Sequence, residues 1–300
     1  MGGAAVLFSL LNVTAKYLGQ DFPLAQLLWV RSAGHLLFVL ALFGPRFGRR
    51  LFATWHPGVQ LLRSTLLLGS TACNFVALRF VGLATAATIN FTSPAIVALL
   101  AAPLLGERVG RARWAAIGIG VLGVLIVVRP GAEAAQVASL LSLGTAVCYA
   151  LYQLLTRRVA ADDPPETTVG YSALVGTVAL TAVVPFAWVA PPSAWKLALL
   201  LSMGLTGGLG HYFVARAYYS APASAVSPFN YIQLLGAALM DYVVFRDPPG
   251  LAVWLGATLI VSSGLFIAYA ERRVSRPFGK AVATASQPSN GISGGTARSR

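Results

Sequence analysis

The side chains of this chain that could bind or protonate a ligand lie inside long apolar segments. Asp241 is a carboxylate in such a segment, and Arg31 and His35 lie four positions apart in another. A spacing of four places two side chains on the same face of a helix. Because a charged group in hydrocarbon costs free energy unless it has a partner or faces water, these residues predict ion pairing, proton exchange or the binding of an anionic group.

Each of these groups has a structural and a functional interpretation. Asp241 either pairs with a cation or hydroxyl, or exchanges a proton. Arg31 either fixes its helix to a neighbouring backbone or holds an anionic group of a ligand. His35 and His211 either make hydrogen bonds in a packed core or take part in proton coupling, since histidine titrates near physiological pH.

Uncharged hydrogen-bonding side chains accompany these groups in the apolar segments. Amides and tyrosines of this kind would line a cavity with aromatic walls, which suits a small, partly apolar metabolite better than a bare ion. The candidate binding residues are Asn12, Arg31, His35, Asn74, Asn90, Tyr149, Tyr152, Gln153, His211, Tyr212, Asn230 and Tyr231. The candidate coupling residue is Asp241.

The sequence gives little evidence for the motifs of soluble enzymes or of metal sites. Gly118, Gly120 and Gly123 match G-x-G-x-x-G, but they lie inside an apolar segment and lack the strand that must precede a dinucleotide-binding turn. Small residues in such a segment more often let two helices pack closely. The sequence contains no HExxH, CxxC or P-loop pattern. We therefore predict no catalysis, no cofactor and no metal site.

The composition predicts the elements that carry these residues. Hydrophobic residues make up 57% of the chain, charged residues only 10%, and the mean hydropathy is +0.72. A helix of about 20 apolar residues crosses the hydrocarbon of a membrane with its backbone fully paired. We predict an all-α, polytopic membrane protein with ten transmembrane helices. They are expected at residues 3–19, 24–43, 59–80, 83–105, 114–129, 137–157, 168–189, 194–216, 223–245 and 251–270.

The basic residues predict the orientation of these helices. They lie at the ends of the apolar segments and not along one face, so nucleic acid is not an expected partner. Most of the 22 Lys and Arg residues fall on one side if both termini are cytoplasmic, which is the positive-inside signature. These are Arg46, Arg49, Arg50, Arg63, Arg108, Arg111, Arg113, Arg157, Arg158, Arg216 and the basic residues of the C-terminal tail.

The two halves of the chain resemble each other. Residues 75–80 recur at 213–218, displaced by 138 positions, and Asn12 and Lys16 match Gln153 and Arg157 at a displacement of 141. Each half holds five helices, an odd number, so the second half enters the membrane upside down. Inverted repeats are typical of transporters that bind substrate near the membrane midplane. The expected domains are residues 1–130 and 131–272, followed by a disordered cytoplasmic tail at 273–300.

A family resemblance adds to this interpretation. Pro94 is followed by Leu-Leu-Gly-Glu-Arg at 104–108 and by glycines at 118 and 123, and Gln26 precedes Arg31. With these residues the chain resembles the drug/metabolite transporter superfamily, EamA type, over residues 4–272. The second half departs from the pattern, because Val-Phe-Arg at 244–246 replaces Gly-Glu-Arg. The resemblance implies ten helices in two inverted repeats, cytoplasmic termini, a central cavity and secondary transport, often export of small metabolites.

These observations together predict a secondary active transporter in the inner membrane of a bacterium, working by alternating access. We expect an exporter of a small metabolite, driven by a gradient such as that of protons. The substrate classes that the resemblance implies are amino acids, vitamins, nucleoside-like compounds and opine-type metallophores. The alternatives are an uptake carrier for a vitamin such as riboflavin, a channel, or an enzyme embedded in membrane lipid.

Overall fold

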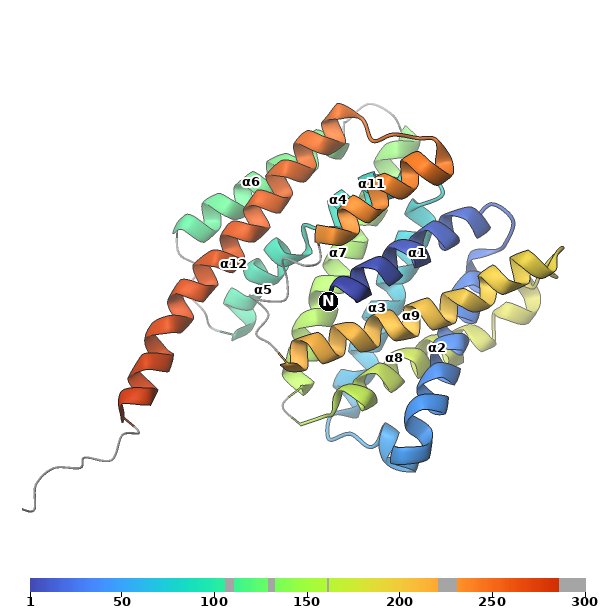
Figure 1. The fold of residues 1–300 in the computed structure, drawn as a ribbon, viewed down its shortest axis with the longest axis horizontal. Coiled ribbons are helices and arrows are strands. Elements are labelled where there is room, and N and C mark those ends of the chain that lie inside the picture. The colour runs from blue at the N-terminus through green and yellow to red at the C-terminus, as the bar shows by residue number, and fades with distance from the viewer. Residues whose placement is uncertain (106–110, 129–132, 161, 221–230, 286–300) are drawn as a thin grey trace, which may run out of the picture.

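The computed structural model describes residues 1–105, 111–128, 133–160, 162–220 and 231–285. Within these residues the chain is helical and has no strand, and its helices pack side by side in one bundle (Figure 1). The all-α prediction is confirmed.

The helices of the first half are α1 (Gly2–Leu18), α2 (Leu24–Phe47), α3 (Pro57–Ala77), α4 (Leu83–Asn90), α5 (Ser93–Leu105) and α6 (Arg111–Val128). Those of the second half are α7 (Glu133–Val159), α8 (Pro165–Thr181), α9 (Ala194–Ser220), α11 (Ile232–Phe245) and α12 (Leu251–Ala285).

The outer surface of the bundle has the character of a membrane protein. Three helical segments of the described chain are long and apolar enough to cross a membrane: 24–52, 136–159 and 194–217. Large apolar side chains are exposed along other helices too, including Leu235 on α11 and Leu125 on α6, at 63% and 58%. Water would disfavour so much exposed apolar surface on a soluble monomer, whereas lipid accepts it. The fold therefore fits a polytopic membrane protein.

The two halves of the chain are interleaved. Helices α1 and α2 pack against α9, and α3 packs against α7 and α8. Three further contacts also join the halves, namely α1 with α11, α4 with α11, and α6 with α12. Figure 1 shows α1 beside α9 and α6 beside α12. The principal interfaces of the bundle are therefore interfaces between the first and the second half.

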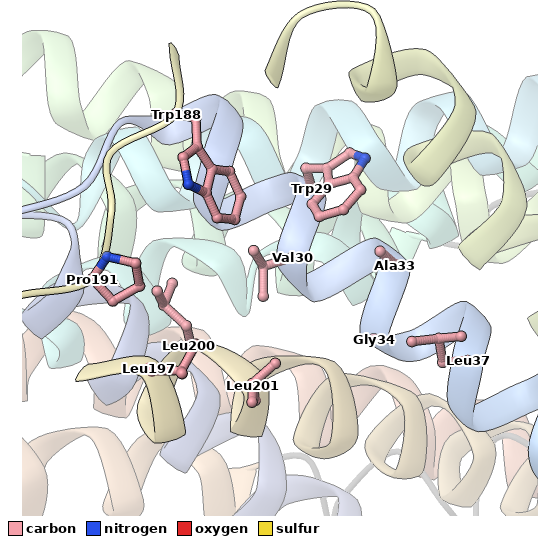
Figure 2. A pocket seen from close by; sticks show the side chains of 10 residues that line it. All are labelled: Trp29, Val30, Ala33, Gly34, Leu37, Trp188, Pro191, Leu197, Leu200 and Leu201. Atoms are coloured by element: carbon pink, nitrogen blue, oxygen red, sulfur yellow. The ribbon is translucent and has the colours of Figure 1, made fainter. Parts of the chain in front are cut away.

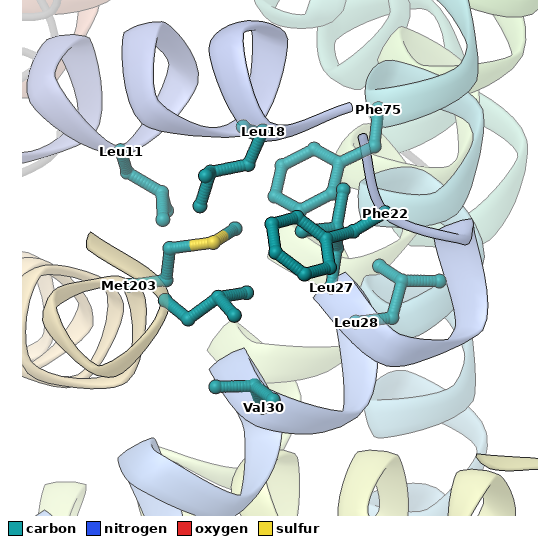
Figure 3. Close-up of a cluster of buried hydrophobic side chains, with 10 residues drawn as sticks. Leu11, Leu18, Phe22, Leu27, Leu28, Val30, Phe75 and Met203 are labelled. Carbon is teal, nitrogen blue, oxygen red and sulfur yellow. The ribbon is translucent and has the colours of Figure 1, made fainter. Parts of the chain in front are cut away.

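The largest buried apolar cluster joins both halves. It contains Leu18 from α1, Leu27 from α2, Phe75 from α3 and Met203 from α9, each no more than 4% exposed. Figure 3 shows these side chains converging where α1, α2 and α9 meet. Dispersion contacts of this kind hold membrane helices together, because lipid is as apolar as the side chains and burial from water contributes little.

Glycines bring two pairs of helices into backbone contact. A Cβ atom on Gly204 of α9 would lie 2.5 Å from the Cα atom of Gly34 on α2. A Cβ atom on Gly123 of α6 would lie 2.9 Å from the carbonyl oxygen of Gly256 on α12. Both distances exclude any side chain larger than hydrogen without a shift of the helices. Gly123 thus has the packing role expected from the sequence, and so does Gly120, which faces Ser263 on α12.

One turn occurs twice, displaced by 141 residues. After α1, two successive amides donate to the carbonyl of Leu18, and after α7 two successive amides donate to the carbonyl of Val159. All four hydrogen bonds measure between 2.8 and 3.1 Å. The next helix then begins directly after Pro23 in the first case and after Pro164 in the second. This displacement equals the one by which Asn12 and Lys16 match Gln153 and Arg157.

The predicted fourth span is broken near Pro94. Helix α4 ends at Asn90, and α5 begins at Ser93 with Pro94 as its second residue. Proline is well suited to the first turn of a helix, where its missing N–H has no partner to lose. Pro228, expected to kink the ninth span, lies outside the described residues. At the C-terminus, α12 continues to Ala285 and so overlaps the beginning of the segment predicted to be disordered.

Candidate binding site between the two halves

A cluster of buried cationic and imidazole groups lies between α2 and α9. Nη2 of Arg31 is 3.0 Å from Nε2 of His211. Because a guanidinium only donates, His211 accepts through Nε2 and carries its proton on Nδ1. The ring of His35 stacks on that of His211 at 5.8 Å with an interplanar angle of 8°. All three side chains are buried, so α2 and α9 bring together three of the predicted binding residues.

Two atoms in this cluster have no partner among the described residues. They are Nε of Arg31 and Nε2 of His35, and both are buried. A buried polar atom without a hydrogen bond costs about 1–3 kcal/mol. In the part of the chain that the structure describes, no carboxylate lies within ion-pair distance of Arg31. The cluster therefore holds excess positive charge and an unused donor, which suit a ligand with acceptor oxygens.

A second buried arginine, Arg63 on α3, lies near an aromatic pair on α7. Nη1 and Nη2 of Arg63 both donate to the carbonyl of Thr168 and to Oγ of Ser172 on α8. Its guanidinium carbon lies 5.0 Å from the centre of the Tyr152 ring, which in turn stacks on Tyr149 at 5.6 Å. The tyrosine pair thus provides an aromatic wall beside Arg63, where α3 packs against α7.

Three asparagines form a hydrogen-bonded chain across the first half. Nδ2 of Asn90 donates to Oδ1 of Asn74 at 3.0 Å, and Nδ2 of Asn74 donates to Oδ1 of Asn12 at 3.1 Å. These residues come from α4, α3 and α1. Asn90 closes α4, which is eight residues long, so its amide lies roughly 12 Å along that helix from its start. Oδ1 of Asn90 is buried without a described partner. An unused acceptor therefore lies at the end of α4.

Asp241 on α11 has partners from two other helices. Its carboxylate accepts from Nζ of Lys16 at 3.1 Å and from the backbone amides of Leu83 and Ala84 at 3.0 and 2.8 Å. These amides belong to the start of α4, where unpaired N–H groups and the helix dipole favour an anion. Asp241 is 2% exposed, so its charge is compensated by a cation and a helix end together.

The remaining predicted residues lie apart from the Arg31 cluster. Tyr212 packs against Phe43 at 5.1 Å, in a polar pocket at the end of α2. Tyr231 packs against Phe91 at 5.2 Å, at the break between α4 and α5. Gln153 is half-buried on α7. Asn230 lies outside the described residues.

Arg63 is the buried residue that sequence reasoning missed, because it was counted with the cytoplasmic charges. It lies about two turns into α3, the same depth at which Arg31 lies in α2. The similar position of the two arginines within their helices could have indicated that Arg63 is buried as Arg31 is.

An apolar groove opens on the side of the bundle near the start of α2. Figure 2 shows its lining, in which Trp29 and Val30 face Trp188, Leu197 and Leu200. Its volume is about 170 Å³, and none of the predicted binding residues lines it. Its apolar walls are those expected of a surface covered by lipid chains.

Ionic contacts also join the loops at both ends of the bundle. At one end, Oδ2 of Asp21 lies 2.9 Å from Nζ of Lys196. At the other, Oδ2 of Asp162 lies 2.9 Å from Nε2 of His56. Asp21 and Asp162 occupy the same position in the two copies of the repeated turn. The two contacts therefore occupy equivalent places in the two halves.

These features define a helical membrane bundle with buried polar groups at the interface of two similar halves. The model of the EamA-like transporter family matches this chain twice, at residues 1–129 and 136–269. The chain therefore belongs to the EamA-like transporter family, as the sequence motifs suggested.

Relatives of known name agree with a transporter. The chain is 33% identical to a riboflavin transporter of Rhizobium johnstonii over 91% of both chains. It is 27% identical to an S-adenosylmethionine uptake transporter of Rickettsia conorii, over 87% of this chain and 88% of the relative. It is 29% identical to the pseudopaline exporter CntI of Pseudomonas aeruginosa, over 86% of this chain and 90% of the relative. One crystal structure shares the fold with a TM-score of 0.63 and 19% identity, over 91% of this chain and 98% of the other.

Proposed function

We propose that this protein is a secondary carrier that moves a small organic metabolite across the inner membrane by alternating access between two inverted halves. The observation that carries the proposal is the Arg31 cluster, where a buried guanidinium and an imidazole retain unpaired atoms at an interface of the halves. Most buried polar atoms of a packed core have a partner. Nε of Arg63 is unpaired too, but Nη1 and Nη2 of Arg63 each make two hydrogen bonds, whereas Arg31 makes one among the described residues. The Arg31 cluster therefore retains more donors for a ligand.

The pattern of helix contacts supports the inverted repeat. Exchanging the halves turns α1 into α7, α2 into α8 and α3 into α9. The contact of α1 with α9 then becomes that of α7 with α3, and the contact of α2 with α9 becomes that of α8 with α3. Both members of each pair are present. Such an exchange is what a pseudo-two-fold axis between five-helix halves produces, and the repeated turn supports it independently.

The loop contacts support the ten-crossing topology with cytoplasmic termini. In that topology the loop after α2 and the loop after α7 are both cytoplasmic, and His56 and Asp162 join them. The loop after α1 and the start of α9 are both external, and Asp21 and Lys196 join them. Each contact connects two segments that the positive-inside pattern assigns to the same side.

The substrate has acceptor oxygens and a ring system. Acceptors suit the free Nε donor of Arg31, and Nε2 of His35 can donate or accept according to its tautomer. A ring suits the stacked Tyr149 and Tyr152. The asparagine chain adds an amide acceptor for a ring N–H group. Among the relatives, the riboflavin transporter is the one whose named substrate carries such a ring with imide oxygens. Riboflavin is therefore the first compound to test, followed by zwitterionic metabolites that carry a carboxylate.

Counterflow in liposomes tests the carrier and its substrate together. Liposomes with the purified protein and preloaded with riboflavin should accumulate labelled riboflavin transiently, whereas a channel would only equilibrate it. Arg31→Met should reduce the accumulation at least about tenfold. Arg49→Gln, which removes an exposed arginine from the short 3-10 helix Gly48–Phe52 after α2, serves as the control. Simple equilibration would overturn the carrier mechanism, and counterflow of a carboxylate compound alone would replace riboflavin as substrate.

We propose efflux as the direction to be tested first. The relative named as a pseudopaline exporter supports export, while the relative named as an S-adenosylmethionine uptake transporter supports the opposite direction. Inverted and right-side-out membrane vesicles distinguish the two. Accumulation by inverted vesicles on imposing a proton gradient corresponds to efflux, and accumulation by right-side-out vesicles alone would assign uptake.

Asp241 is the proposed coupling residue. While ionised, it holds Lys16 and the first amides of α4 in place. Protonation would remove the charge of Asp241 and weaken both contacts. Helix α4, whose last residue Asn90 belongs to the asparagine chain, would then be released. Asp241→Asn should therefore abolish the response of transport to a pH gradient while counterflow persists. Unchanged gradient-driven transport in a folded Asp241→Asn protein would leave Asp241 with a structural role only.

A further inference from the structure

A polar pocket lies where the last turns of α2 and α9 meet the first turn of α8. Its volume is about 450 Å³. Phe43 of α2 and Tyr212 of α9 form its floor, with ring centres 5.1 Å apart. The residues that line it are Leu42, Phe43, Arg46, Phe47, Glu166, Tyr212 and Arg216.

The two helices place one arginine each above this floor. Arg46 follows Phe43 by three positions, and Arg216 follows Tyr212 by four, so each arginine lies one turn further along on the same face. Helices α2 and α9 run in the same direction, because Gly34 contacts Gly204 earlier and Phe43 contacts Tyr212 later in both. The two guanidinium groups therefore face one pocket from two sides.

The charged groups of this pocket lack ion-pair partners among the described residues, although the Arg46 guanidinium carbon lies 6.0 Å from the centre of the Phe47 ring. Neither Arg46 nor Arg216 has a described carboxylate within ion-pair distance, and Glu166 is likewise unpaired. The pocket thus combines two guanidinium groups, one carboxylate and a phenol, with a net charge of +1 from its lining residues. Two convergent guanidinium groups match the oxygens of a phosphate group.

We propose that this pocket is a phosphate-binding site, distinct from the Arg31 cluster. Leu42 is 51% exposed and lies one turn before Arg46, so apolar surface continues from the pocket along the side of α2. Basic pockets between membrane helices at the headgroup level recognise anionic lipids. The phosphate is carried by an anionic phospholipid headgroup or by a soluble phosphate, and the shared chemistry is the contact of the phosphate with Arg46 and Arg216.

Glu166 gives the proposal a directional test. Its carboxylate repels a phosphate and competes for the arginines, so Glu166→Gln should tighten phosphate binding, whereas removal of the arginines should weaken it. A pocket that merely tolerates adsorbed lipid would not respond in opposite directions to these two changes.

The test uses the full-length protein in neutral detergent, with three probes. They are dioleoyl phosphatidylglycerol, dioleoyl phosphatidylcholine as the lipid without net charge, and inorganic phosphate. Native mass spectrometry gives the lipid affinity, and the thermal unfolding midpoint reports phosphate binding at constant ionic strength. Arg46→Gln/Arg216→Gln should weaken binding about a hundredfold, because it removes two guanidinium contacts that are each worth about a factor of ten. Glu166→Gln should tighten it about two- to fivefold, and Arg49→Gln, which carries the same change outside the pocket, should leave it unchanged.

The probes separate the two sources of phosphate. Tight phosphatidylglycerol binding that millimolar phosphate does not displace assigns a lipid headgroup. Stabilisation by inorganic phosphate without preference between the lipids assigns a soluble ligand. Wild-type affinity in the double variant, or binding of none of the probes, overturns the proposal. If the double variant does not fold, the single variants Arg46→Gln and Arg216→Gln replace it with the same expected direction.

Discussion

Two buried arginines, Arg31 and Arg63, each join a helix of the first half to a helix of the second half, and they differ in their contacts. Arg31 joins α2 to α9, and Arg63 joins α3 to α8, two helix pairs that the proposed inverted repeat would exchange. Arg63 makes four hydrogen-bond contacts of 2.6 to 3.2 Å with Thr168 and Ser172 and lies against the ring of Tyr152. Arg31 makes one, to His211.

The difference teaches which of the two interfaces is built for stability. A guanidinium with several acceptors is held in one geometry and has few donors left for a ligand. A guanidinium with a single imidazole acceptor keeps most of its donors, at a cost in folding free energy. We therefore assign Arg63 to holding the halves together and Arg31 to binding the substrate. The predictions below test this division.

The largest expected effect is on stability at Arg63. Arg63→Met keeps an apolar side chain of similar length but removes every contact to Thr168 and Ser172. We expect a loss of about 3 kcal/mol in unfolding free energy, the value of hydrogen bonds from one charged group. Thermal unfolding of the purified protein measures it. A midpoint close to that of the wild type would show that the α3–α8 interface does not depend on Arg63.

The matching change at Arg31 should affect transport more than stability. Arg31→Met removes one described hydrogen bond and relieves a buried charge, so unfolding free energy should fall by no more than about 1 kcal/mol. Counterflow should fall at least about tenfold, as expected when one charge-assisted contact to a ligand is lost. If Arg31→Met unfolds as readily as Arg63→Met and the remaining folded protein transports normally, the division of roles is wrong.

Changes at His211 sharpen the comparison, because it supplies the single described acceptor of Arg31. His211→Phe keeps a ring against His35 and Phe8 but removes the acceptor, and we expect a loss of about 1–2 kcal/mol. His211→Gln restores an acceptor and should recover part of that loss. Equal stability of the two variants would show that the ring contacts, and not the hydrogen bond, hold this residue.

The smallest effect is expected at Ser172. Ser172→Ala removes one acceptor of Arg63 while the carbonyl of Thr168 remains within 2.6 Å of Nη2, so the loss should be about 1 kcal/mol with transport unchanged. A double-mutant cycle with Arg63→Met isolates the contact. Additive effects of the two changes would mean that Ser172 and Arg63 do not stabilise each other.

Much of the fold followed from hydropathy. The apolar segments and the packing role of Gly123 are governed by local sequence, and the structure agrees with both. Most helix ends differ by a few residues, but α8 ends at Thr181 where the prediction gave 189, and α12 continues to Ala285 where it gave 270. Hydropathy does not mark where a helix stops.

The candidate site was predictable only in part. Arg31 and His35 share a helix face, so their proximity could be inferred, but their contact with His211 depends on how α9 packs. The partners of Asp241 required the same knowledge, since the amides of Leu83 and Ala84 lie far from it in sequence. Arg63 was missed because counting basic residues by side of the membrane treats every arginine near a span end as a topological signal.

The contact between Gly34 and Gly204 has a consequence for how this protein can vary. These residues have no functional group, yet they fix how near α2 approaches α9 and hence the 3.0 Å separation of Arg31 from His211. A methyl group at either position would force the helices apart. The facing residue could not compensate, because it is already glycine and no smaller residue exists. Selection acting on the ligand chemistry of this interface is therefore expected to constrain two positions that never meet the ligand.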